Sequence, residues 1–243
     1  MKFVAQYIEQ RDIVPSDFNF HLTRLWSVIE ALAGKDARLA EWFLQANTVA
    51  EARLYPIYEQ KALLSPAAKA VLDEQYRNEK GHPKAVGMWN GESVKKDGAS
   101  IMLIFDNSPM PGDLDITLGE ENTTVCRLGD FNAIAQIVST IASVYMPAYV
   151  AAAPRTYSSK RVFDDKPGVG WMLYLPGVIT IQQVPEARAL IPVHAASKRQ
   201  TGTIIVSVTD AVFSVDNPEH IEIANRIEIR LVDQHLLPRY VDL

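Results

Sequence analysis

Short spacing between strand-like segments is the feature that most restricts how this chain can fold. Between Gly81 and Arg127, turn-rich stretches such as "NSPMPGD" and "GEEN" separate segments that are rich in apolar residues. These connections are too short to hold the crossover helix that two parallel strands need. The spacing therefore predicts an antiparallel meander. Its four predicted strands span residues 85–89, 100–105, 114–118 and 124–127.

Helical patterns lie on both sides of the meander. Apolar residues from Phe18 to Leu32 recur at helical spacing, and Gly34 is placed to end that helix. Thr48 and Glu51 form a capping-box pattern, which marks the start of a helix. Further helices are predicted after Asp36, Ser65, Asp130 and Asn217, and the last of them extends toward His235.

Strand patterns also occur outside the meander, at residues 2–9, 149–153, 170–175, 178–182 and 203–208. Together the elements predict an α+β fold, in which helices pack on one face of an antiparallel sheet. The segments 86–89 and 169–171 both place a Val-Gly pair close to a tryptophan. We therefore expect one domain over residues 1–243, and we interpret this echo as a degenerate duplication with halves of about 1–129 and 130–243.

The composition excludes several classes of protein. Of the 243 residues, 48% are hydrophobic and 22% are charged, which is typical of a soluble globular protein. The start of the chain is not a signal peptide, and no apolar run approaches the ~20 residues that cross a bilayer. The formal net charge is -5 and no basic patch is present, which argues against nucleic-acid binding and is compatible with a basic protein partner. A cytoplasmic protein with no membrane attachment is expected.

No motif in the chain predicts catalysis, a metal or a cofactor. "GVGWMLYLPG" lacks the glycine spacing of phosphate-binding loops, so its glycines are expected to flank a buried strand. The five histidines form no ligand pair, no nucleophile elbow is present, and Cys126 has no catalytic motif around it. We therefore expect a binding protein and not an enzyme. Five aromatic residues are predicted to belong to the structural core: Trp26, Trp42, Trp89, Trp171 and Tyr174.

A group of acidic residues in the meander allows three interpretations. They can solvate the ends of hairpins, form a negative surface for a basic partner, or hold a divalent cation. Their spacing does not match the calcium-binding loop. The group, which is also our candidate surface for binding a protein partner, consists of Asp106, Asp113, Asp115, Glu120 and Glu121.

Three stretches give the chain a resemblance to a known family. They are "RLWSVIEALAGKDARLAEWFLQ", "MWNG" and "GVGWMLYLP". With these stretches the chain resembles the bacterial immunity proteins of family fifty-two, over roughly residues 3–239. Since the matching positions are apolar and aromatic, the resemblance assigns them a structural role.

The resemblance implies a function. Such proteins are encoded beside polymorphic toxins, including type VI secretion effectors with restriction-endonuclease-like DNase domains. The immunity protein binds its cognate toxin in the cytoplasm of the producing cell and blocks it, with no catalysis and no cofactor. The alternatives are a small-molecule enzyme with a dispersed active site and an oligomeric adaptor or scaffold protein.

Overall fold

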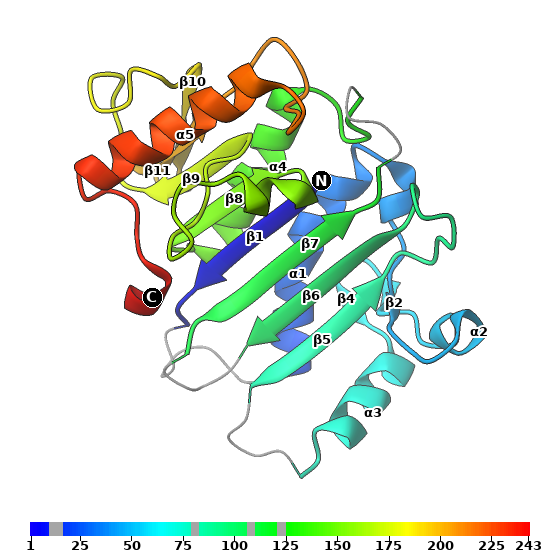
Figure 1. Cartoon of the computed structure of the whole chain (residues 1–243). Coiled ribbons are helices and arrows are strands. Elements are labelled where there is room, and N and C mark those ends of the chain that lie inside the picture. The colour runs from blue at the N-terminus through cyan, green and yellow to red at the C-terminus, as the bar shows by residue number, and fades with distance from the viewer. Residues whose placement is uncertain (10–16, 79–82, 106–109, 121–124) are drawn as a thin grey trace.

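A computed structural model describes residues 1–9, 17–78, 83–105, 110–120 and 125–243 (Figure 1). Within these residues, nine strands form one sheet in the order β10-β11-β9-β8-β1-β7-β6-β5-β2, and all of its strand pairs are antiparallel. The strands are β1 (Lys2–Tyr7), β2 (Phe43–Leu44), β5 (Lys84–Trp89), β6 (Ala99–Phe105), β7 (Gly112–Leu118), β8 (Tyr149–Ala153), β9 (Met172–Pro176), β10 (Ala189–His194) and β11 (Gln200–Val206). A separate small hairpin joins β3 (Tyr58–Gln60) and β4 (Leu63–Leu64).

The helices begin where side chains cap their free backbone N–H groups. Asp17, Thr48, Ser65, Asp130 and Asn217 each accept a hydrogen bond from the first turn of the helix that follows. These helices are α1 (Phe18–Ala33), α2 (Val49–Ala52), α3 (Pro66–Gln75), α4 (Phe131–Tyr145) and α5 (Pro218–Asp233), and the 3-10 turns are η1 (Ala37–Leu39), η2 (Arg155–Ser159) and η3 (Tyr240–Asp242). The predicted α+β class and the antiparallel meander are confirmed. None of the described helices is both long and apolar enough to cross a membrane.

Three predicted elements are wrong. The described part of the fourth meander strand, residues 125–127, is a loop, in which the Arg127 side chain reaches back to Asp36. Residues 178–182 form an irregular segment that leads into a turn, because Gly177 takes a φ of +90° and bends the chain away from the sheet. The edge position goes instead to β10, which the sequence pattern missed. The helix expected after Asp36 is only the 3-10 turn η1, since Phe43 and Leu44 pair with β5.

Alternation along the central strands separates two faces of the sheet. One set of side chains is buried against α1 and α4 and forms the main core (Figure 1). In β1, β5, β6 and β7 this set comprises Phe3, Ala5, Tyr7, Val86, Met88, Ala99, Ile101, Leu103, Phe105, Leu114, Ile116 and Leu118. The opposite set faces away from both helices.

Helix α5 packs on that opposite face, but only at one end of the sheet. Ile227 and Leu231 of α5 share a second core with Leu173 of β9 and Ile205 of β11. Helices therefore lie on both sides of the sheet at this end. The apolar stripe in the sequence of α5 predicts that one side of the helix is buried. It does not predict which face of the sheet the helix packs on. No helix covers the same face of β5, β6 and β7 within the described residues (Figure 1).

Candidate functional site

The side of β5, β6, β7 and β1 that faces away from α1 and α4 is the surface that we call the open face. It is covered toward β8, where Tyr149 is buried in the second core and Val4 and Ala151 pack against that core. Strand register places its side chains in three cross-strand rows. The first row is Trp89, Ser100, Thr117, Lys2 and Ala153; the second is Gly87, Met102, Asp115, Val4 and Ala151; the third is Ala85, Ile104, Asp113, Gln6 and Tyr149.

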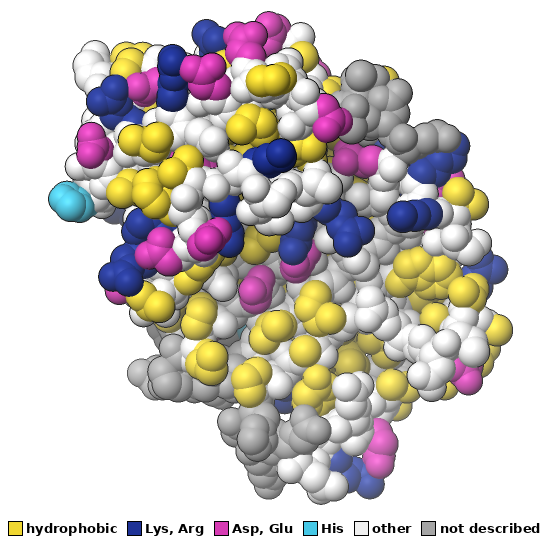
Figure 2. All heavy atoms as spheres, viewed as in Figure 1, with side chains coloured by type: hydrophobic (Ala, Val, Ile, Leu, Met, Phe, Trp, Pro, Cys, Tyr) yellow, Lys and Arg dark blue, Asp and Glu magenta, His cyan; other side chains and the backbone are white. Residues whose placement is uncertain are grey.

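The β5–β6 end of the open face is apolar. Met102 is 38% exposed, and Trp89 and Ile104 are half-buried beside it. The Trp89 indole is held in place, because its Nε1 donates to the carbonyl oxygen of Glu92 at 3.0 Å and its ring lies 6.4 Å from that of Phe43. Figure 2 shows hydrophobic side chains gathered on this face below α5, with Lys and Arg side chains along the border above them. A patch of this kind, rimmed by charge, is typical of protein-binding sites.

Charged side chains occupy the β7–β1 part of the open face. The Lys2 ammonium lies 2.6 Å from the Asp115 carboxylate. Burial raises the pKa of Asp113, and the neighbouring charge of Asp115 raises it further. Glu120, at the end of β7, forms an ion pair with the amino group of Met1. The acidic residues of β7 are therefore partly neutralised by cations from β1.

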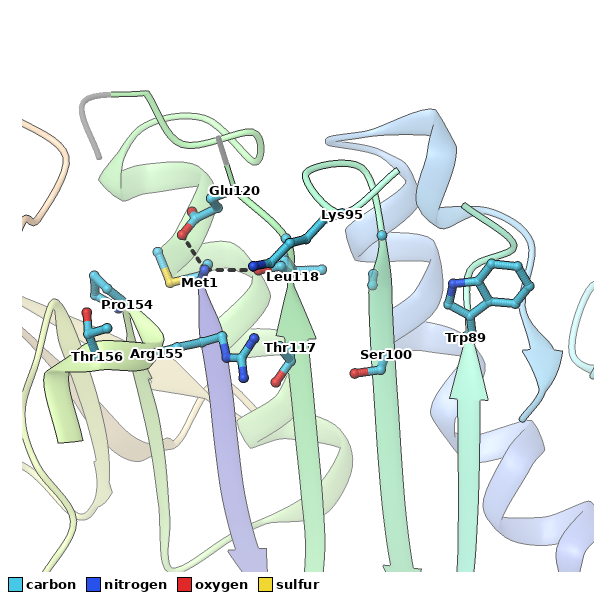
Figure 3. A pocket seen from close by; sticks show the side chains of 13 residues that line it. Met1, Trp89, Lys95, Ser100, Thr117, Leu118, Glu120, Pro154, Arg155 and Thr156 are labelled. Atoms are coloured by element: carbon cyan, nitrogen blue, oxygen red, sulfur yellow. Dashed lines mark hydrogen bonds and ion pairs between the residues drawn. The ribbon is translucent and has the colours of Figure 1, made fainter. Parts of the chain in front are cut away.

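A pocket of about 460 Å³ opens at the end of the first row (Figure 3). Trp89, Ser100 and Thr117 point into it from neighbouring strands, and Arg155 enters from η2. Lys95 lines the same pocket from the β5–β6 turn. Arg155 and Lys95 are exposed, and neither side chain makes an ion pair or hydrogen bond to any residue that the structure describes. The pocket thus holds the positive charges of Arg155 and Lys95, unpaired with any described residue, beside the Trp89 indole. We call this part of the open face the positive corner.

Comparison with protein families gives a match over nearly the whole chain. The family model described as "Immunity protein 52" matches residues 4–239. The chain belongs to this family. A search among curated proteins finds no match. Among solved structures, the immunity protein 52 chain is similar to "Pseudomonas aeruginosa T6SS protein PA0821", with a TM-score of 0.47, 11% identity, and coverage of 93% of this chain and 75% of the other.

The structure separates the predicted acidic group of this immunity protein 52 chain. Asp113 and Asp115 lie on the open face, and Glu120 lies at its end against Met1. Asp106 and Glu121 lie outside the described residues. Among the described residues, no group of three or more His, Cys, Asp and Glu side chains is arranged to hold a metal ion.

The predicted core aromatics fall into two groups. Trp42, Trp171 and Tyr174 are buried, with relative exposures of 2%, 0% and 3%. Trp26 is half-buried, and its ring packs edge-on at 4.9 Å from that of Tyr58. Trp89 is also half-buried, but it belongs to the open face. The "MWNG" stretch therefore presents its tryptophan to the surface and not to the core.

Two buried side chains, Asn90 and Asp36, support the open face, and the sequence pattern does not predict this role for either. Asn90 is buried, accepts a hydrogen bond from the N–H of Ala99 at 2.7 Å, and donates to the carbonyls of Arg38 and Asp97. It holds the turn that carries Lys95. Asp36 bridges Arg38 and Arg127, and Arg127 donates to carbonyls of the same turn. The available signal was the Asn-Gly pair after a strand, which is typical of a tight turn.

Proposed function

We propose that this chain neutralises a cognate toxin by binding it directly and covering its active site or substrate groove. Membership of the immunity protein 52 family is the observation that supports the proposal. The chain would act by binding alone, in the cytoplasm of the producing cell. We further propose that the toxin is a nuclease effector of a type VI secretion system, as the resemblance to the immunity protein family implies.

The open face offers a surface of the kind that this function needs. A stable complex buries on the order of 1,600 Å² in total, and its contact area combines an apolar centre with a polar rim. We place Asp113 and Asp115 within the contact, opposite basic groups of the toxin. A nuclease that grips phosphates presents such groups, and opposite charges speed association. Glu120 remains a candidate for the border of the same contact, and Asp106 and Glu121 remain candidate toxin-binding residues.

Co-expression with the neighbouring toxin gene tests the proposal. The toxin domain encoded next to this gene should kill the host when expressed alone, and expression of this chain should restore growth. The purified pair should elute as one complex in size-exclusion chromatography, and the chain should stop degradation of plasmid DNA by the toxin. Continued killing together with separate elution would contradict the immunity function. Protection from a toxin that leaves DNA intact would contradict only its assignment as a nuclease.

A further inference from the structure

The open face carries an apolar patch and a positive corner side by side. Trp89 lines the corner pocket and Met102 lies in the next row, one strand away. Gly87 pairs with Met102 across the strands, and it has no side chain to cover that residue. The Gln45 side chain occupies this space: a Cβ added at Gly87 would lie 2.6 Å from Gln45 Oε1. Met102 is nevertheless 38% exposed, so the side chain in the middle of the patch stays accessible.

The charge on this face is divided. Lys2 and Asp115 are paired in the middle of the face, and Glu120 is paired with the Met1 amino group. Arg155 and Lys95 remain unpaired with any described residue. A partner that covers the pocket would remove both cations from water, which is costly unless it supplies opposite charge. The complementary group is a carboxylate, since a planar guanidinium pairs well with it.

We propose that the toxin docks on the open face with an apolar side chain bordered by one or more carboxylates. The apolar side chain packs on Trp89 and Met102, and the carboxylates pair with Arg155 and Lys95. Aromatic, Met and Arg residues are enriched at the energetic centres of protein interfaces, and Trp89, Met102 and Arg155 bring all three to this part of the open face. The held indole of Trp89 needs little further ordering on binding, which favours affinity.

The inference rests on the proposed function, because it takes the cognate toxin as the occupant. Charge complementarity supports this occupant. A partner that fits the open face would place basic groups opposite the acids of β7 and carboxylates opposite Arg155 and Lys95. The carboxylates that would pair with Arg155 and Lys95 are different groups of the toxin from the basic groups that we place opposite Asp113 and Asp115.

Two single variants with matched controls test the docking site. Arg155→Glu reverses the charge at the corner, and Met102→Gln removes the apolar contact at an exposed position. Arg77→Glu is the control for charge, because Arg77 is exposed next to α3, where Tyr76 packs on Phe18 of α1. Met146→Gln is the control for the apolar change, since Met146 is 76% exposed at the end of α4, on the other side of the sheet. Equal melting temperatures would establish that all four variants fold.

The measured quantity is affinity for the purified toxin domain encoded by the adjacent gene. We expect Arg155→Glu and Met102→Gln each to weaken binding by about tenfold or more, as substitutions at interface centres do. The two controls should bind as the wild type does. The loss in Arg155→Glu should appear partly in the association rate and should shrink at high salt.

The outcomes separate the two proposals. A wild-type chain that does not bind the toxin overturns the proposed function, and the docking site with it. Wild-type binding that neither face variant weakens overturns the docking site alone. A dimer of this chain that Met102→Gln dissociates, with unchanged toxin affinity, assigns the face to a second copy and also overturns the inference.

Discussion

The Lys2 ammonium on β1 lies 2.6 Å from the Asp115 carboxylate on the neighbouring strand β7. Both side chains are about one-third exposed, at 38% and 31%. Because water screens such pairs, the bridge contributes little to folding, typically ~0–1 kcal/mol. The ion pair matters for the charge of the open face, because Lys2 neutralises Asp115, one of the two acids of β7.

Reversal of both β7 acids tests their place in the contact. We expect Asp113→Lys with Asp115→Lys to slow association with a toxin that presents basic groups, more strongly at low salt than at high salt. Stopped-flow or surface-based kinetics at two salt concentrations measures this. Asp73→Lys on α3 is the control for Asp115, since Asp73 is likewise an acid paired with a lysine. Equal melting temperatures would establish that the variants fold. An association rate equal to that of the control would place both acids outside the contact.

Asp36 makes folding stability depend on pH. Burial alone would raise the pKa of Asp36, but hydrogen bonds from Arg38 and Arg127 outweigh it and lower the pKa to about 2 from an ordinary value of 3.8. The folded state therefore prefers the ionised carboxylate. Its contribution, about 2 kcal/mol, is complete above pH 3.8 and is lost as the pH falls toward 2.

Urea unfolding of Asp36→Asn and of the wild type across this pH range checks the assignment. At pH 7 the variant should be less stable by about 2 kcal/mol, and the two proteins should converge as the pH approaches 2. A difference that stays constant over this range would show that Asp36 does not act through its charge.

Trp171 is expected to stabilise the core and to take no part in toxin binding. Its side chain is 0% exposed, and its Nε1 donates to the carbonyl oxygen of Val208 at 2.9 Å. Trp171→Ala should cost about 3–5 kcal/mol of unfolding free energy, as expected for a buried aromatic residue. Toxin affinity, measured where the variant is still folded, should stay unchanged. Retained stability with lost binding would assign Trp171 to the contact.

Glu228 connects α5 to the segment that carries Arg155. The carboxylate is 1% exposed and accepts hydrogen bonds from the hydroxyl of Tyr157 in η2 and from the N–H groups of Val162 and Val169. Glu228→Ala would leave two backbone N–H groups without an acceptor, at about 1–3 kcal/mol each.

Loss of this anchor should also weaken toxin binding, because η2 would no longer hold Arg155 at the corner. Denaturant unfolding measures the first effect and binding of the folded variant measures the second. Tyr157→Phe is the milder comparison, since it removes one donor to Glu228 and leaves both N–H bonds. Unchanged affinity in Glu228→Ala would show that the position of η2 does not matter for docking.

Local features of the sequence predicted much of the fold. Side chains at Thr48, Ser65, Asp130 and Asn217 cap helices because the capping bond joins residues two or three positions apart. The strands β5, β6 and β7 were predicted for a similar reason, since short turns leave antiparallel pairing as their only option. The predicted strand at 178–182 failed because one residue, Gly177, redirects the chain.

The sequence by itself determined the α+β class, the central meander and the family to which the chain belongs. Only the tertiary structure decided that Trp89 and Met102 face outward, with Asp113 and Asp115 on the same side. Alternation along a strand divides side chains into two sets, but it does not say which set the helices cover. That choice depends on where α1, α4 and α5 pack, and those contacts join residues that are far apart in the chain.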